Sequence, residues 1–237
     1  MVAYGAACNF GDQLHPAGEM DLETYRRIGE AYAYVEQIEA YGVGGKPTAT
    51  LGVWRSNSEP DDEGVARILL ETQTDFVVVD PQGDLAPYRA IILTGAPCLA
   101  QQEANKLGRY VAGGGSVLAL AQSILDRRGQ RVVLDVGADY MGPPEYDIDY
   151  LVLGDVLGRG LVSSPFLNYE AALRVRPRPG SQVLASVREP YFSRTYGRYC
   201  SHQNTPYRLE DAAHAGALRT GNVVYLPHAL GRLYHAH

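Results

Sequence analysis

Three polar side chains lie within four positions of a loop near the start of the chain. They are Asp12, Gln13 and His15, in the segment GDQLHP. A carboxylate, an amide and an imidazole together supply hydrogen-bond donors and acceptors, a set that suits binding to a polyhydroxylated ligand. The residues leave a second interpretation open, a polar loop without a ligand, because Gly, Pro and polar residues are typical of turns.

Cysteine is the second residue type that could do chemistry. Cys98, in GAPCLA, follows a predicted strand and lies near a predicted helix start, where backbone N–H groups favour a thiolate. Nothing in the sequence assigns it a histidine partner, so we expect a structural role and keep a thiol-dependent hydrolase as an alternative. Cys8 is expected in the core, and Cys200 beside His202 does not make a metal site.

Other polar clusters have structural interpretations. The acidic run 59–63 is expected at a helix start, where acids oppose the helix dipole. The run 113–115 of glycines precedes a strand, so it lacks the helix amides that hold phosphate. No metal and no cofactor are predicted, because the late histidines lack zinc-ligand spacing. Four tyrosines are better placed for an interface or a ligand: Tyr191, Tyr196, Tyr199 and Tyr207.

Composition bounds the class of protein. The chain has 237 residues, 46% hydrophobic and 20% charged, with a formal net charge of −6. These values are ordinary for a globular protein with a sizeable core, and the acidic balance argues against nucleic-acid binding. No apolar run reaches membrane-spanning length, no secretory signal is visible, and three cysteines far apart in sequence indicate reduced thiols. A cytoplasmic protein is therefore expected.

The first 40 or so residues of the chain predict one β/α unit. Residues 2–8 predict a buried strand, and Asp21 predicts the N-cap of an amphipathic helix. One β/α unit cannot bury such a helix alone, so the helix must pack on something. Either the α/β domain that follows or the rest of a larger barrel could cover it. Its apolar stripe consists of Leu22, Tyr25, Ile28, Tyr32, Val35 and Ile38.

The remainder predicts a doubly wound α/β domain followed by a β-rich part. Apolar strands at 50–54, 76–79, 88–93 and 117–121 alternate with amphipathic helices at 63–73 and 99–111, which indicates a mostly parallel sheet covered on both faces. Beyond residue 125 we expect strands at 150–153, 172–176 and 183–187, the last two joined across Pro179-Gly180, and a hairpin of 216–219 with 223–226.

Several segments resemble a known family. CNFGDQLHPAGEMDLETYRRIGEAYAYVEQIE is similar to the end of the catalytic barrel in glycoside hydrolases related to β-galactosidases and α-L-fucosidases. The later segments DLAPYRAIILTGAPCLAQQEANKLGRYVAGGGSVLA, REPYFSRTYGRYCSHQNTPY and GNVVYLPHALGRLY resemble the glutamine-amidotransferase-like domain of these proteins, the β-galactosidase trimerisation domain. The resemblance covers nearly the whole chain.

The resemblance implies residues 1–43 as the terminal β/α unit of a barrel and residues 48–237 as a class I amidotransferase-like, flavodoxin-like domain. It implies a non-catalytic part of a glycosidase, with the rest of the barrel, a homo-oligomer and carbohydrate as partners. The catalytic carboxylates, which act as a pair, are expected on absent strands, so this chain alone is not expected to hydrolyse glycosides. The Asp12, Gln13 and His15 loop would face the sugar site, with His202 and Gln203 over the same mouth.

An amidotransferase site is not expected in the second domain. The nucleophile elbow should follow the strand at 117–121, where the residues are Ala121, Gln122, Ser123 and Ile124. No cysteine stands there and the flanking glycines are absent, so Ser123 is a poor nucleophile candidate. A carbohydrate-binding or interaction module that acts alone remains the alternative function beside the Cys98 hydrolase.

Overall fold

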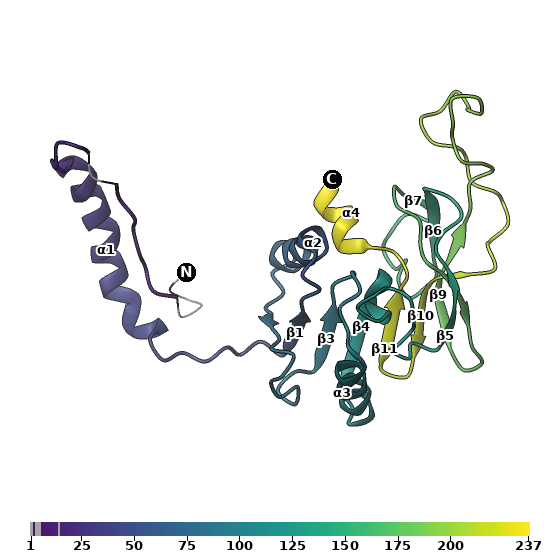
Figure 1. The fold of residues 1–237 in the computed structure, drawn as a ribbon, viewed down its shortest axis with the longest axis horizontal. Coiled ribbons are helices and arrows are strands. Elements are labelled where there is room, and N and C mark those ends of the chain that lie inside the picture. Colours follow the sequence, from purple (N-terminus) through teal and green to yellow (C-terminus); the bar gives the residue numbers. More distant parts are fainter. Residues whose placement is uncertain (1, 3–5, 14) are drawn as a thin grey trace. The chain divides into compact units, whose positions relative to one another are not determined.

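The computed structural model describes residues 2, 6–13 and 15–237 (Figure 1). These residues form two compact units, Met1–Thr48 and Ala49–His237. The first contains one helix beside an N-terminal segment, and the second contains the sheets and the remaining helices.

Helix α1, Leu22–Gly42, begins where the sequence predicts. The Asp21 side chain accepts hydrogen bonds from the backbone N–H groups of Glu23 at 3.1 Å and Thr24 at 3.4 Å, which satisfies two otherwise unpaired donors of the first turn. The strand expected at 2–8 lies partly outside the described residues, and residues 6–8 do not form a strand.

The apolar stripe of α1 remains largely uncovered. Leu22 is 77% exposed and Tyr32 is 40% exposed, while the other four stripe residues are half-buried. An open groove of about 610 Å³ runs between α1 and the N-terminal segment, and Tyr32 and Val35 line it. An apolar face of this kind normally packs against another surface.

The second unit is built on a nine-stranded sheet in the order β2-β1-β3-β4-β11-β10-β9-β6-β7. The first five strands in this order are mutually parallel, and the following pairs are antiparallel. Their bounds are β1 Leu51–Trp54, β2 Val77–Val78, β3 Ala90–Leu93, β4 Ser116–Leu120, β6 Asp149–Leu153, β7 Phe166–Asn168, β9 Gln182–Arg188, β10 Ala215–Thr220 and β11 Val223–Leu226.

Helices cover both faces of the parallel part, as the apolar pattern predicts. Helix α3, Gln101–Ala112, contributes Leu107 to a core with Ile91 and Leu93 on one face. Helix α2, Glu59–Glu71, contributes Val65 and Leu69 to a core on the opposite face. The mixed α/β class with a large parallel sheet is therefore confirmed, and α2 begins at the acidic run, whose residues form its first turn.

Helix α4, Leu230–Ala236, packs against α2 and was not predicted. The two helices approach each other through glycines, because a Cβ on Gly64 would lie 1.8 Å from the carbonyl oxygen of Gly231. A seven-residue helix gives too short a periodic pattern to recognise in a sequence.

The β-rich part contains two strands that were not predicted, β5, Ala138–Gly142, and β7, Phe166–Asn168, and it differs from the prediction in one connection. β10 and β11 form the expected hairpin around Gly221. The strands on either side of Pro179-Gly180, however, enter different sheets: β8, Arg174–Pro177, pairs with β5, Ala138–Gly142, whereas β9 pairs with β6 and β10. Long-range pairing decides this outcome, which turn residues alone do not specify. Among the described residues, no helix has both the length and the apolar character needed to cross a membrane.

Candidate functional site

The carboxyl ends of the parallel strands bring several polar loops to one edge of the sheet. In open α/β sheets a ligand crevice lies at this edge, where the strand order reverses. Here the order reverses between β1 and β3, which places Ser56 and Asn57 after β1 close to Thr94 after β3.

The Asp62 carboxylate lies at these strand ends. It accepts hydrogen bonds from the Ser56 N–H at 2.8 Å, the Ser56 hydroxyl at 3.0 Å, the Asn57 N–H at 3.0 Å and the Thr94 hydroxyl at 2.5 Å. Backbone N–H groups and hydroxyls at such a position are the donors that bind an anionic ligand in related folds. In this chain the Asp62 carboxylate accepts the hydrogen bonds of these donors.

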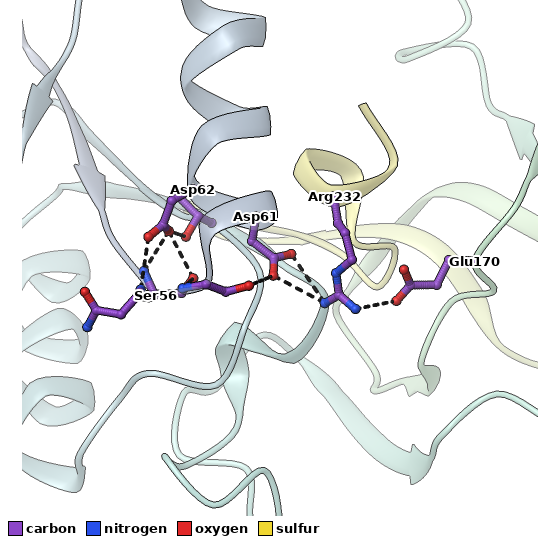
Figure 2. A network of polar contacts seen from close by, with 8 residues as sticks. Ser56, Asp61, Asp62, Glu170 and Arg232 are labelled. Atoms are coloured by element: carbon purple, nitrogen blue, oxygen red, sulfur yellow. Dashed lines mark hydrogen bonds and ion pairs between the residues drawn. The ribbon is translucent and has the colours of Figure 1, made fainter. Parts of the chain in front are cut away.

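The neighbouring Asp61 begins a second, buried network (Figure 2). Asp61 is completely buried, accepts from the Ser58 hydroxyl at 2.6 Å and pairs with the Arg232 guanidinium at 3.3 Å. Arg232 also pairs with Glu170 at 3.1 Å. Gly95 makes room for this carboxylate, since a Cβ there would lie 2.5 Å from Asp61 Oδ1. The ion pairs neutralise a buried charge and link α2 to α4.

The turn after β4 has the geometry of an elbow without a nucleophile. Ala121 begins the 3₁₀ turn η2, Ala121–Ile124, with φ of +42°, a value that non-glycine residues adopt rarely. Its carbonyl accepts from the Tyr225 hydroxyl at 2.8 Å. Ser123 is completely buried, and its Oγ accepts from the Leu120 N–H at 3.1 Å. The strained position therefore carries only a methyl group, and the Ser123 hydroxyl accepts a hydrogen bond within the turn.

Cys98 lacks the features of an activated thiol. Burial, together with the nearby Glu103 and Asp62 carboxylates, raises the pKa of this thiol to about 12. A nucleophilic cysteine requires the opposite shift, because the thiolate is the reactive species. The thiol-dependent alternative is not supported by this environment.

A buried acid–imidazole pair was missed in the sequence. His228, after β11, places Nε2 2.8 Å and 2.9 Å from the two carboxylate oxygens of Asp149 on β6, and the two residues are 3% and 2% exposed. Asn168 donates to Asp149 at 3.1 Å, and so does the Ala172 N–H at 2.8 Å. This cluster joins the parallel and antiparallel halves of the sheet, and its burial indicates a structural role.

The predicted residues of the first unit form an exposed loop. The Tyr25 hydroxyl donates to Asp12 at 2.8 Å, and this contact raises the pKa of Tyr25. The Ala17 N–H donates to Nδ1 of His15 at 3.2 Å, and Gln13 is exposed. The hydrogen bond from Tyr25 to Asp12 thus holds the loop to α1, while the side-chain amide of Gln13 is exposed.

His202 and Gln203 lie in a long loop of the second unit, and both are exposed. Arg194 donates to both of their backbone carbonyls, at 3.3 Å in the case of His202. The Cys200 thiol donates to the carbonyl of His202 at 3.5 Å. The backbone at these two residues is therefore braced, whereas their side chains face outward.

The sequence signals for the buried residues were ambiguous. Asp61 and Asp62 lie in the acidic run 59–63, which predicts a helix start as well as it predicts a site. Arg232 and His228, which pair with Asp61 and Asp149, are more than 75 residues away from them in the sequence, so only the fold brings each pair together. Among the described residues, no three His, Cys, Asp or Glu side chains are arranged to hold a metal.

The fold and these contacts define an α/β unit in which the donors at the strand ends are paired with its own Asp62 carboxylate. The chain aligns over 99% of its length with 37% of an α-L-fucosidase, isoenzyme 2 from Paenibacillus thiaminolyticus, at 29% identity and a TM-score of 0.89. A β-galactosidase from Bacillus circulans sp. alkalophilus aligns over 93% of this chain and 34% of its own, at 13% identity and a TM-score of 0.63.

A ThuA-like protein from Bacteroides uniformis aligns over 78% of this chain and 84% of its own, at 12% identity and a TM-score of 0.51. It and the β-galactosidase show similarity of fold alone. The resemblance to glycosidases of the fucosidase and β-galactosidase group is confirmed, and the chain spans about a third of those glycosidases. A scan against protein-family models and a search of curated proteins gave no match.

Proposed function

We propose that this chain is a non-catalytic region of a glycoside hydrolase, in which residues 1–43 complete a catalytic barrel and residues 48–237 form a supporting, oligomerising domain. The observation that carries the proposal is the alignment of 99% of the chain with 37% of the α-L-fucosidase. That alignment includes both units, so the combination of a helical unit and an α/β unit is itself shared with a glycosidase.

The uncovered stripe of α1 supports this role. Burial of one large apolar side chain contributes roughly 1.5–3 kcal/mol, and the stripe holds six such residues, of which Leu22 is 77% exposed. The remainder of a barrel would supply the apolar surface that this helix requires. Such packing would hold the Asp12 loop at the barrel face where active sites lie.

The second unit is suited to support because its carboxylates near the strand ends, Asp61 and Asp62, already have partners. Asp62 satisfies the donors at the strand ends, and Asp61 is buried against Arg232. Glycoside hydrolysis needs two carboxylates beside the scissile bond, a task that neither of these can perform while paired inside the unit. Asp12, Gln13 and His15, with His202 and Gln203, remain the proposed groups at the edge of the sugar site.

The test is a chimera in which residues 1–237 replace the matching third of the Paenibacillus α-L-fucosidase. We expect the chimera to hydrolyse p-nitrophenyl α-L-fucoside, and the isolated chain to show no turnover. Turnover by the isolated chain would contradict the proposal, and so would a folded chimera with no activity.

Adjacent residues of α1 provide a matched pair of variants. Val35 lies in the stripe and lines the groove, whereas Tyr34 is 62% exposed on another side of the helix. Val35→Asp in the chimera should reduce soluble, active enzyme by roughly tenfold or more, because it places a charge in an apolar contact. Tyr34→Asp should leave activity within about twofold. Equal effects of the two changes would show that the stripe does not bind the barrel.

A further inference from the structure

A groove at the amino ends of the parallel strands has a charge opposite to that of the chain. It measures about 750 Å³ and lies between α3, the glycine run 113–115 and the loop that leads into β3. Three cations line it, Arg89, Lys106 and Arg109, together with one acid, Asp84. The chain as a whole has a formal net charge of −6, so this cationic groove is a local feature of the surface.

The three cations lack carboxylate partners. Among the described residues, no acidic side chain lies within ion-pair distance of Arg89, Lys106 or Arg109. The Lys106 ammonium donates to the carbonyl of Pro81 at 2.7 Å and to that of Gly83, and carbonyls do not neutralise its charge. Arg89 and Arg109 are exposed, so their guanidinium groups are available to an anion.

The walls of the groove are fixed by contacts within the α/β unit. The Arg89 N–H donates to the Thr50 carbonyl at 2.7 Å, and the Arg89 carbonyl accepts from the Ser116 N–H at 3.1 Å. The ring of Tyr110 covers Gly115, where a Cβ would lie 2.2 Å from the ring. A site whose walls are already ordered loses less conformational entropy when a ligand binds.

The dipole of α3 accounts for only one of these cations. Arg109 lies in the last turn of the helix, where the dipole favours a positive charge. Arg89 instead precedes β3, and Lys106 donates to the loop before that strand. Since three cations from two elements converge on one groove without acids to pair with, we expect an anionic ligand there.

The donors and rings of the groove favour carboxylates carried on sugar rings. Guanidinium groups pair with carboxylates through two parallel hydrogen bonds. Phosphate sites in α/β folds use free backbone N–H groups, whereas those of residues 113–115 already donate to carbonyls of α3. Tyr88 and Tyr110 line the groove, half-buried, with the Tyr110 hydroxyl donating to the Tyr88 carbonyl at 3.1 Å. Their rings add an apolar surface that suits the face of a sugar.

We propose that this groove binds an acidic sugar chain whose carboxylates pair with Arg89 and Arg109. The choice of carbohydrate rests on the proposed function, because a region of a glycoside hydrolase acts beside sugar chains. The volume of the groove, about 750 Å³, falls within the roughly 300–1,000 Å³ of sites for small ligands. Lys106 would add positive charge to the wall.

The test is calorimetric titration of the full chain with oligogalacturonate, a sugar chain with one carboxylate on each ring. We expect a dissociation constant below about 1 mM. Arg89→Gln and Arg109→Gln should each raise it at least about tenfold, because each removes a charge-assisted pair. Arg159→Gln, at an exposed arginine between β6 and β7, is the control and should change it by less than about twofold. Circular dichroism should be the same for all three variants.

Two further ligands separate the two parts of the proposed chemistry. An uncharged galactan oligomer lacks the carboxylates, and polyglutamate has carboxylates without sugar rings. Each should bind at least about tenfold more weakly than oligogalacturonate. Equal binding of galactan would overturn the role of the arginines, and equal binding of polyglutamate would replace the sugar chain with an acidic peptide.

Three other results would overturn the proposal: a dissociation constant above about 1 mM, binding unaffected by both groove substitutions, or an equal loss in Arg159→Gln. The fucosidase chimera separates this inference from the proposed function. An active chimera together with any of these results rejects the groove alone, whereas an inactive folded chimera rejects the glycosidase role itself.

Discussion

At the scale of single residues, the chain uses its potentially reactive groups as structural partners. Asp62 accepts hydrogen bonds from Ser56, Asn57 and Thr94 at the strand ends, and Ser123 is buried as an acceptor for Leu120. The strained position at the end of β4 is held by Ala121. Strain of this kind is common at functional sites, but here no reactive side chain accompanies it.

Cys98 provides the residue-scale prediction. Burial raises its pKa to about 12, so the thiolate is scarce at every pH below that value and alkylation, which needs the thiolate, is slow. At pH 8 we expect iodoacetamide to modify Cys98 in the native chain at least about a hundredfold more slowly than in the urea-unfolded chain, as measured by peptide mass spectrometry. Equal rates in the two states would contradict this protection, and a faster reaction in the native chain would indicate an activated thiol and return the Cys98 hydrolase to consideration.

At the scale of elements, two contacts connect parts that are distant in the sequence. α2 and α4 meet at Gly64 and Gly231, beside the Asp61–Arg232 ion pair. His228 after β11 and Asp149 on β6 connect the parallel and antiparallel halves of the sheet. Asp61, Asp149 and His228 are buried, so removal of the partner of any one of them would leave a buried polar group unsatisfied.

The glycine contact between the helices gives a matched prediction. Gly64→Ala would place a Cβ 1.8 Å from the Gly231 carbonyl, so we expect the free energy of unfolding to fall by about 1–3 kcal/mol. Gly108→Ala, in α3, meets no atom within 4 Å and should instead stabilise the chain by roughly 0.5–1 kcal/mol through helix propensity. Urea denaturation measures both, and a stabilising Gly64→Ala would show that α2 and α4 do not approach so closely.

At the scale of the whole molecule, the two units differ in how completely they bury apolar surface. The unit Ala49–His237 has helices on both faces of its sheet and closed cores around Ile91 and Val53. The unit Met1–Thr48 presents the stripe of α1, with Leu22 77% exposed. The unit Ala49–His237 therefore has its own buried cores, which independent folding requires, whereas helix α1 of the unit Met1–Thr48 needs an additional apolar surface to pack against.

This difference predicts the behaviour of the second unit alone. Residues 49–237 should fold without residues 1–48, with a Tm within about 2 °C of the main transition of the full chain. The reason is that the core clusters of the second unit contain no residue of the first unit. The shortened chain should also bind less of a hydrophobic dye, since the stripe is gone. Calorimetry and dye fluorescence check this, and loss of cooperative unfolding in residues 49–237 would contradict it.

The sequence predicted those elements whose signal is local. Alternating apolar strands and amphipathic helices identified the parallel part of the sheet, Asp21 identified the start of α1, and Gly221 identified the hairpin. α4 is too short for its period to be seen, and the partners of β8 and β9 depend on long-range pairing. The Asp12, Gln13 and His15 loop and the His202 and Gln203 pair remain predictions.

Taken by itself, the sequence determined the α/β class, the amphipathic face of α1, the lack of a nucleophile after β4 and the resemblance to glycosidases, because each depends on residue type and near-neighbour spacing. Only the tertiary structure decided that Asp62 pairs with the donors at the strand ends, that Asp61 meets Arg232 and that Asp149 meets His228. The last two pairs join residues far apart in the chain. Burial in one core, rather than any local pattern, makes a hydrogen-bonded partner for each of them necessary.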